Sequence, residues 1–99
     1  MLSIELHPEA EFELEDAEAY YEQIYPELRL QFRKEIEFFS KHISQHPESA
    51  MRYSGTIRRV VLQQFPYSIY YEVTPSRVLF YAIGHNSQRP HYWKSRSFG

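Results

Sequence analysis

The sequence predicts a small α+β domain in which a helical hairpin packs on a mainly antiparallel sheet, in the order β-α-α-β-β-β. Three observations predict this fold. Apolar residues recur every three or four positions in the first half, they alternate or run continuously between residues 56 and 83, and six prolines fall between these segments. Because a chain of 99 residues supports one hydrophobic core, we expect a single domain over residues 1–99.

The first element is a short strand that ends before Pro8. Leu2, Ile4 and Leu6 alternate with polar residues, which is the period of two expected for a strand with one buried face. Proline has a fixed φ angle and no amide hydrogen, so it is favourable in the first turn of a helix. We therefore expect the first helix to begin near Pro8.

Two amphipathic helices follow, with a short break at Tyr25 and Pro26. Apolar side chains recur at helical spacing in both: Ala10, Leu14, Ala17, Tyr21 and Ile24 in the first helix, and Leu28, Phe32, Ile36, Phe39 and Ile43 in the second. Pro47 ends the second helix, since the residue before a proline disfavours the helical conformation. So short a connection makes the helices antiparallel neighbours, each with an apolar stripe.

Three further strands are expected in the second half of the chain. Residues 56–62 are rich in β-branched side chains, residues 67–73 alternate, and residues 77–83 form an apolar run typical of a strand buried on both faces. Turn-forming residues separate them, so an antiparallel meander is expected. The helical hairpin can cover only one face of this sheet, which leaves apolar surface for a partner that adds a strand to the sheet edge or lies in a groove.

Charge is unevenly distributed along the chain. Residues 1–50 contain 4 Lys+Arg and 12 Asp+Glu, whereas residues 51–99 contain 7 and 1, so the net charges of the halves are −8 and +6. This asymmetry predicts an acidic surface and a basic surface, and the basic one is expected to meet a polyanion or an acidic partner. The alternative interpretation is that the two halves neutralise each other within the fold.

Composition excludes several classes of protein. No segment approaches the roughly 20 apolar residues of a membrane-spanning helix, and the absence of cysteine excludes disulfides and thiol chemistry. The N-terminus is acidic where a signal peptide would be basic and then apolar. We expect a cytoplasmic protein without membrane association, cofactor or metal. His42 and His46 are spaced to share a metal, but no third ligand is evident.

Five local motifs follow one another in an order that resembles the RelE/ParE toxin superfamily. They are HPEA (residues 7–10), GTIRR (55–59), FPYSIYYEV (65–73), AIGH (82–85) and RPHYWKSR (89–96). The FPY turn and the RPxYW tail are closer to the ParE side. The resemblance spans nearly the whole chain and implies a RelE/ParE-like fold. It also implies a role in plasmid stabilisation as the toxin of a type II toxin–antitoxin system, in a hetero-oligomer with a cognate antitoxin.

The resemblance implies one of two targets, because ParE-like members inhibit DNA gyrase and RelE-like members cut messenger RNA on the ribosome. For a gyrase inhibitor, the basic second half predicts target contacts at Arg58, Arg59, Arg89, Trp93 and Arg96. The third alternative is a family member that has lost toxicity and only binds a partner.

A ribonuclease would need a proton acceptor, a cation for the phosphate and an acid for the leaving oxygen. Its candidate catalytic residues are His85, Tyr92 and Arg58. Ribosome-dependent members usually carry basic side chains at two positions where this chain has Ser68 and Asn86. The isoelectric point of 6.2 is also low for a protein that binds nucleic acid. We therefore favour the gyrase inhibitor.

Each of these residues also has a structural interpretation. Arg58 and Arg59 are neighbours in a strand and point to opposite faces, so one of them can pair with the acidic helices. A histidine at a strand end, such as His85, is more often a hydrogen-bonded structural residue than a catalyst. Tyr92 and Trp93 can fold back over the core, whereas the basic residues that flank them favour an exposed recognition surface.

Overall fold

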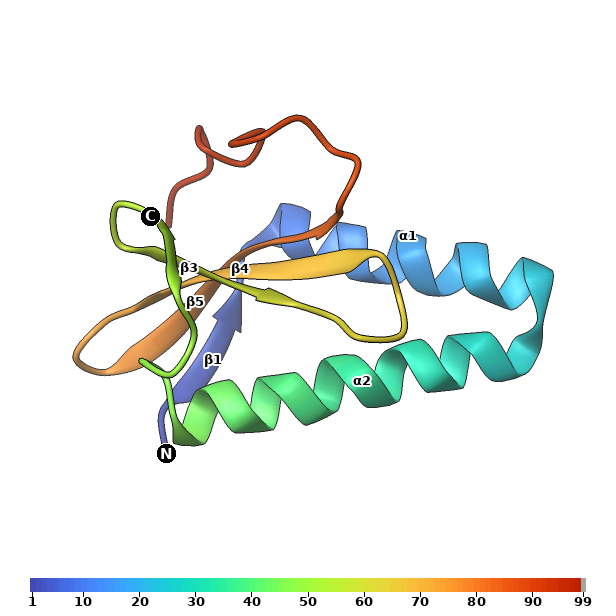
Figure 1. The fold of residues 1–99 in the computed structure, drawn as a ribbon, viewed down its shortest axis with the longest axis horizontal. Coiled ribbons are helices and arrows are strands. Elements are labelled where there is room, and N and C mark those ends of the chain that lie inside the picture. Colours follow the sequence, from blue (N-terminus) through green and yellow to red (C-terminus); the bar gives the residue numbers. More distant parts are fainter. Residues whose placement is uncertain (99) are drawn as a thin grey trace.

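The computed structural model describes residues 1–98 and contains two helices and five strands (Figure 1). In chain order these are β1 (Ser3–Leu6), α1 (Pro8–Ile24), α2 (Pro26–Gln45), β2 (Arg52–Ser54), β3 (Ile57–Val61), β4 (Tyr67–Val73) and β5 (Arg77–His85). The strands form one sheet in the order β1-β5-β4-β3-β2, in which only β1 and β5 are parallel. The α+β class and the antiparallel meander are confirmed.

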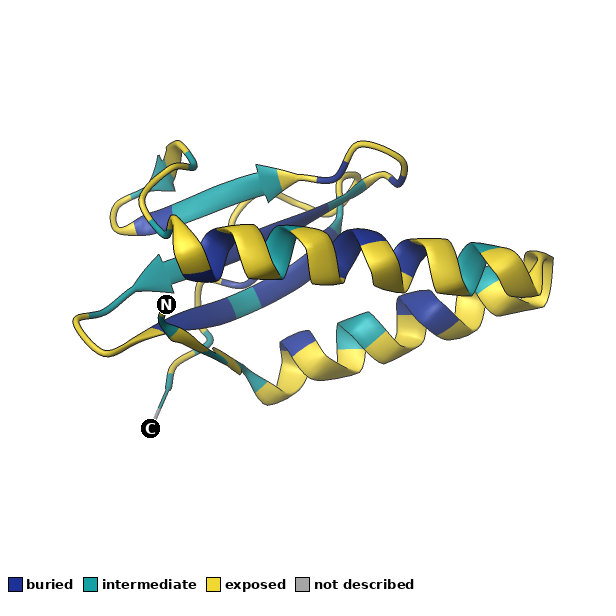
Figure 2. Cartoon of the chain, turned by 90° about the horizontal axis from the view of Figure 1, so that it is seen from below, coloured by how far each residue is buried: buried dark blue, intermediate teal, exposed yellow. Residues whose placement is uncertain are grey.

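Both helices begin where the sequence predicts. Pro8 and Pro26 occupy their first turns, and the His7 ring accepts a hydrogen bond from the amide of Glu9 at 3.1 Å. Arg33 donates to both carboxylate oxygens of Glu18, at 2.7 and 3.1 Å, and so ties α2 to α1. The helices run antiparallel across one face of the sheet (Figure 2). Neither has the length and hydropathy needed to cross a bilayer.

The main core lies between the helical hairpin and the sheet. Its fully buried side chains include Phe32 and Ile43 of α2, Tyr71 of β4 and Phe80 of β5. β5 is buried on both faces, as its apolar run predicts, because the helical hairpin covers one face and residues 86–98 cover the other. Ile24, at the end of the predicted apolar stripe of α1, is 54% exposed because the α1–α2 turn projects beyond the sheet (Figure 1).

A second, smaller core lies on the opposite face of the sheet. Ile57, Tyr70 and Ala82 are buried there beneath Trp93 of the C-terminal segment, which we define as residues 86–98. In Figure 1 this segment loops over the side of the sheet away from α2. The expectation of a half-covered sheet is therefore wrong, because the segment supplies the second cover.

Strand β2 is not among the strands that the sequence predicts. It has only three residues, and its pairing with β3 is interrupted by a register shift between Arg52 and Ser54. A strand this short shows no periodicity in the sequence. The hairpin depends on Gly55, whose φ of 57° is a conformation that side chains with a β-carbon rarely adopt.

Candidate functional site

The predicted target-binding residues gather mainly on the second face of the sheet, around the C-terminal segment. Trp93 is 4% exposed, and its ring centroid lies 5.3 Å from that of Tyr70 and 6.3 Å from that of Tyr53. The indole is thus part of the second core. The sequence left two interpretations of Trp93, a side chain that folds back over the core or one on an exposed recognition surface. The structure shows the first.

Glu13 of α1 joins the C-terminal segment to the rest of the fold. Its carboxylate accepts four hydrogen bonds: one from Tyr92 Oη at 2.7 Å, two from the Arg96 guanidinium at 2.9 Å each, and one from the Ile83 amide at 3.1 Å. The Arg96 side chain is only 9% exposed and also donates to the Tyr81 carbonyl at 3.0 Å. An acidic group of the first half of the chain therefore neutralises a basic group of the second half.

The surroundings of Glu13 shift the pKa values of its partners. Burial, together with the hydrogen bond and the negative charge of Glu13, raises the pKa of Tyr92 well above its usual value. For Arg96, burial lowers the pKa, but the hydrogen bonds and charge of Glu13 outweigh it, so the net shift is upward. The phenol is therefore neutral and the guanidinium charged throughout the physiological range.

Arg59 occupies a polar site at the end of the same face. Its Nε donates to Ser68 Oγ at 3.1 Å and its guanidinium lies 3.4 Å from Asn86 Oδ1, while the Ser68 hydroxyl donates to the same oxygen at 2.7 Å. The guanidinium carbon lies 5.4 Å from the Tyr53 ring and 5.6 Å from the Tyr70 ring. A cation held between aromatic rings and two neutral side chains can meet a carboxylate or a phosphate.

Arg58 points to the other face of the sheet, as expected for the neighbour of Arg59 in a strand. It donates to the backbone carbonyls of Glu48 at 3.1 Å and Ala50 at 2.6 Å. Within residues 1–98, neither arginine forms an ion pair with the helices. Arg58 therefore holds the segment that connects α2 to β2, in place of the pairing with acidic residues that the sequence suggested.

His85 forms a turn at the end of β5. Its Nδ1 accepts a hydrogen bond from the Ser87 amide at 3.0 Å, and its ring packs edge-on against Tyr67 at 5.1 Å. His85 pairs with Tyr67 of β4 and Arg58 pairs with Tyr71, four positions further along the strand. Tyr92, bound to Glu13, lies on the opposite face from Arg58. The structure does not bring the three ribonuclease candidates together.

Two cations of the C-terminal segment are free. Arg89 and Lys94 are exposed, and their side chains form no hydrogen bond or ion pair with any residue that the structure describes. They lie on either side of the anchored Tyr92 and Trp93 in the sequence. The basic surface of the segment therefore consists of Arg89 and Lys94, while Arg96 is directed inward.

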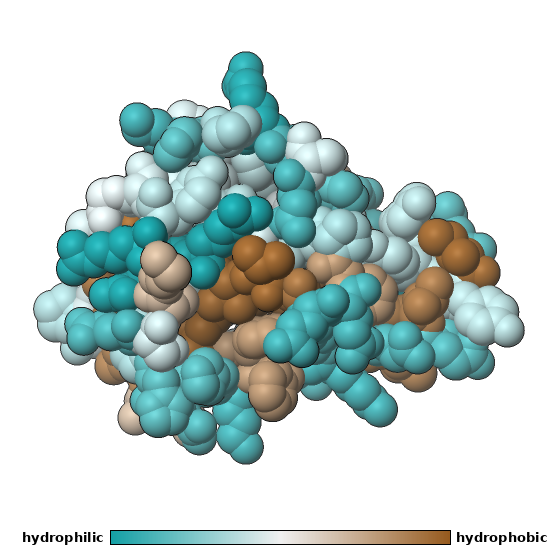
Figure 3. Space-filling view, viewed as in Figure 1, coloured by the Kyte–Doolittle hydropathy of each residue, from teal (hydrophilic) through white to brown (hydrophobic). Residues whose placement is uncertain are grey.

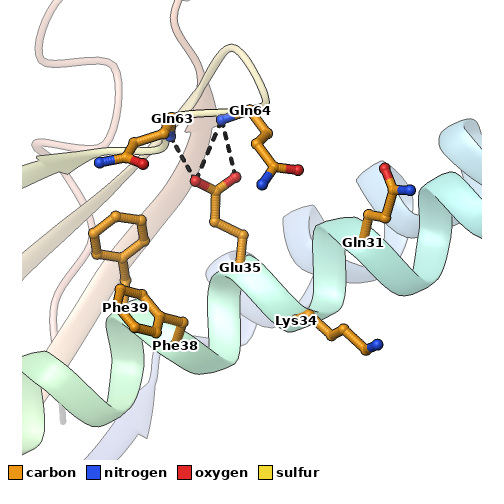
Figure 4. Close-up of a pocket in the computed structure, with 7 residues that line it drawn as sticks. All are labelled: Gln31, Lys34, Glu35, Phe38, Phe39, Gln63 and Gln64. Carbon is orange, nitrogen blue, oxygen red and sulfur yellow. Dashed lines mark hydrogen bonds between the residues drawn. The ribbon is translucent and has the colours of Figure 1, made fainter.

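A separate cavity of about 420 Å³ opens between α2 and the loop after β3 (Figure 4). At its base the Glu35 carboxylate accepts hydrogen bonds from the amides of Gln63 at 2.6 Å and Gln64 at 3.2 Å. Phe38 and Phe39 form its apolar side, and Phe38 is 67% exposed. Figure 3 shows apolar surface in the same region, between β3 and α2. We call this cavity the α2 groove.

Comparison with known proteins places the chain in a family. Residues 4–90 match the model of the ParE toxin of the type II toxin-antitoxin system, parDE. The chain belongs to the ParE toxin family. The predicted resemblance and its ParE side are thereby confirmed, and the chain is grouped with the toxins of type II toxin–antitoxin systems.

A solved structure has the same fold as this ParE-family chain. It is a chain of the chromosomal ParDE TA system from P. aeruginosa, which matches with a TM-score of 0.74 and 21% identity over 86% of this chain and 96% of that chain. No curated protein matches the sequence. At this level of identity the structural likeness supports the fold alone.

The residue of this ParE-family chain that the sequence analysis missed is Glu13. Among the many acidic residues of the first half, its position did not attract attention. A signal was present, because Glu13 lies three positions after Ala10 and four before Ala17, which are both buried. Those spacings place it on the buried stripe of α1, where a carboxylate requires hydrogen-bond donors.

Proposed function

We propose that this protein is a ParE-type toxin that inhibits DNA gyrase and is neutralised by a cognate antitoxin. The observation that favours a binding toxin over a ribonuclease is the state of Tyr92. Its hydroxyl donates to the Glu13 carboxylate at 2.7 Å and its pKa is raised, so it is a poor proton donor for a leaving oxygen. Ser68 and Asn86 supply no charge for a phosphate beside Arg59.

The five proposed target-binding residues have different parts in this proposal. Arg89 carries an exposed charge that can contact gyrase directly, and Arg59 adds a half-buried one. Trp93 and Arg96 act from within by holding the C-terminal segment on the sheet. Arg58 acts further away, through the backbone between α2 and β2. We add Lys94 as a direct contact because it is exposed next to Trp93.

A gyrase supercoiling assay with purified protein tests the proposal. The wild-type protein should inhibit supercoiling, and the double variant Arg89→Ala with Lys94→Ala should need about 10-fold more protein, as expected for the loss of about 1.4 kcal/mol of binding free energy. Lys41→Ala is the matched control, because Lys41 is an exposed cation on α2. Normal supercoiling at excess wild-type protein would overturn the proposal.

Ribosomes programmed with a defined message test the ribonuclease alternative. The proposal expects the message in the A site to stay intact with wild-type protein. Cleavage that disappears in Tyr92→Phe would instead establish the enzyme, since that variant removes only the hydroxyl.

We further propose that the antitoxin occupies the α2 groove with an amphipathic segment that carries apolar and acidic side chains. Phe38 offers the apolar contact, and Lys34 lines the groove without an ion pair to any residue in 1–98. Glu35 is satisfied by the amides of Gln63 and Gln64, which weakens it as an opposing charge. Lys34 is the exposed charged side chain of this groove and Glu35 is buried, which favours a segment with an acidic side chain opposite Lys34.

A further inference from the structure

We propose that Glu13 of α1 is a positioning residue of the toxin. It holds the C-terminal segment in the conformation that presents Arg89 and Lys94 to the target. The identity of the target rests on the proposed function, whereas the anchoring itself rests on the geometry of the segment.

The C-terminal segment has few other attachments to the fold. The Asn86 amide bonds to the Pro66 carbonyl at 2.8 Å and the Gln88 amide to the His85 carbonyl at 2.9 Å. From residue 89 to residue 98, the backbone hydrogen bonds all stay within the segment. Its attachment beyond Gln88 therefore depends on side chains: the packing of Trp93, the contact of Phe98 with Tyr81, the Arg96 bond to the Tyr81 carbonyl and the bonds to Glu13.

Glu13 is suited to this role because both of its oxygen atoms are used. Arg96 lies 83 positions away in the sequence and binds both oxygens, which is the directional, charge-assisted arrangement of a guanidinium and a carboxylate. Tyr92, four residues before Arg96, donates to one of the same oxygens. The Ile83 amide holds the carboxylate itself against β5. The two anchors on the segment thus share one acceptor on the rigid part of the fold.

The docked conformation has features that cost free energy and must be offset. The Trp93 Nε1 is buried without a hydrogen-bond partner among residues 1–98. His91 has a φ of 60°, a conformation that residues with a β-carbon rarely adopt. Because these costs fall on the two residues that flank Tyr92, which binds Glu13, removal of the carboxylate should release the segment.

Release would move the two free cations. Arg89 is one turn from Tyr92, whose amide bonds to the Arg89 carbonyl at 3.2 Å, and Lys94 follows Trp93 directly. Their positions are fixed only while Tyr92 and Trp93 are docked. A surface that recognises a partner through two charges loses affinity when those charges become mobile, because binding must then order them.

Fluorescence tests the anchoring, since Trp93 is the only tryptophan. In Glu13→Ala we expect red-shifted emission and quenching by acrylamide that is several-fold stronger than in the wild type. Glu13→Gln should be intermediate, because its amide oxygen can still accept from Tyr92. Glu15→Gln, which changes an exposed carboxylate on the same helix, should match the wild type. Equal protection of Trp93 in Glu13→Ala and the wild type, with the helices intact by circular dichroism, would overturn the proposal.

Growth of a bacterium that expresses each variant alone tests the positioning role. At equal levels of folded protein, Glu13→Ala should arrest growth at least 10-fold less effectively than the wild type, with Glu13→Gln between them. The double variant Arg89→Ala with Lys94→Ala should lose toxicity while Trp93 stays protected. Full toxicity of Glu13→Ala with a released Trp93 would refute the positioning role alone. A wild-type protein that harms neither growth nor gyrase would overturn the proposed function and, with it, the presentation of the cations.

Discussion

The hydroxyl of Tyr92 lies over Gly84 in the space that a β-carbon would occupy. A β-carbon built on Gly84 would overlap the Tyr92 oxygen and would lie 2.9 Å from the ring carbon that carries it. The ring cannot withdraw without loss of its 2.7 Å hydrogen bond to Glu13. Glycine is therefore required at this position of β5 by the close approach of the C-terminal segment.

The first prediction is that Gly84→Ala displaces Tyr92 and loosens the C-terminal segment. The added methyl group overpacks a well-filled contact, which costs about 1–3 kcal/mol of the free energy of unfolding. Denaturation curves measure this loss, and acrylamide quenching of Trp93 should increase in the folded variant. Gly55→Ala is the control, because Gly55 has a positive φ but nothing within 4 Å of its would-be β-carbon. Gly55→Ala should lose stability without a change in the quenching of Trp93. Quenching in Gly84→Ala that equals quenching in the wild type would contradict the prediction.

The second prediction concerns Glu35 in the α2 groove. Its side chain satisfies two backbone amides in the loop after β3, at 2.6 and 3.2 Å (Figure 4). Glu35→Ala leaves these donors without a protein partner and should cost about 2 kcal/mol of unfolding free energy. Glu35→Gln keeps one acceptor and should cost less.

Hydrogen exchange measures this effect locally. The amides of Gln63 and Gln64 should exchange faster in Glu35→Ala, and they should be unchanged in Glu37→Ala, which removes an exposed carboxylate two positions away. Slow exchange at both amides in Glu35→Ala would show that the carboxylate does not hold the loop.

The elements of this fold that depend on local pattern were predictable, and those that depend on distant pairing were not. Pro8 and Pro26 mark the helix starts, because proline fits the first turn of a helix and disrupts its later turns. The parallel pairing of β1 with β5, which places Ser3 opposite Arg77, joins the two ends of the chain and leaves no periodic signal. Strand β2 was missed for a different reason: it pairs locally with β3, but three residues are too few to show a period.

The candidate site shows the same division. The sequence identified Trp93 and its basic neighbours as important, but an aromatic residue between cations is typical of both a cover and a recognition surface. The choice between these is made by Glu13, which lies far away in the sequence and binds Arg96. Ser68 and Asn86 stand at two separate positions in the sequence, and the structure shows that both accept hydrogen bonds from the Arg59 side chain.

The third prediction concerns alkaline pH. The pKa of Tyr92 is raised by burial and by Glu13 from an ordinary value of 10.0, so the docked segment favours the neutral phenol. Its contribution to stability is fully present below pH 10.0 and is lost as the pH rises toward the pKa in the folded protein. Trp93 emission should therefore be constant from neutral pH to about pH 10 and shift toward the red above it.

Tyr92→Phe separates this residue from the other buried tyrosines. Tyr21, Tyr67, Tyr70, Tyr71 and Tyr81 also have raised pKa values, chiefly because of burial. The variant has no proton to lose at this position and lacks the hydrogen bond to Glu13, so the change in its Trp93 emission above pH 10.0 should be smaller and report only the remaining tyrosines. If Trp93 emission showed release of the segment below pH 10.0 in the wild type, the assignment to Tyr92 would be wrong.

The fourth prediction is that Phe38→Glu weakens neutralisation by the antitoxin. Phe38 and Phe12 are both 67% exposed, Phe38 beside the α2 groove and Phe12 on α1, so Phe12→Glu makes the same chemical change outside the groove. The groove variant places a negative charge where an acidic, apolar segment is expected to bind. Its affinity for the antitoxin should fall at least 10-fold, or by about 1.4 kcal/mol, whereas Phe12→Glu should bind like the wild type. Lys34→Glu should weaken binding as well, by loss of charge complementarity alone.

Co-expression provides the measurement, with the gene product that neutralises the wild-type toxin as the antitoxin. Cells should recover when this product is expressed with the wild type or with Phe12→Glu, and they should stay arrested with Phe38→Glu. Calorimetry with the purified pair then gives the affinities. The opposite result, in which Phe12→Glu escapes neutralisation and Phe38→Glu does not, would place the antitoxin on α1, because the two phenylalanines differ in location and not in exposure.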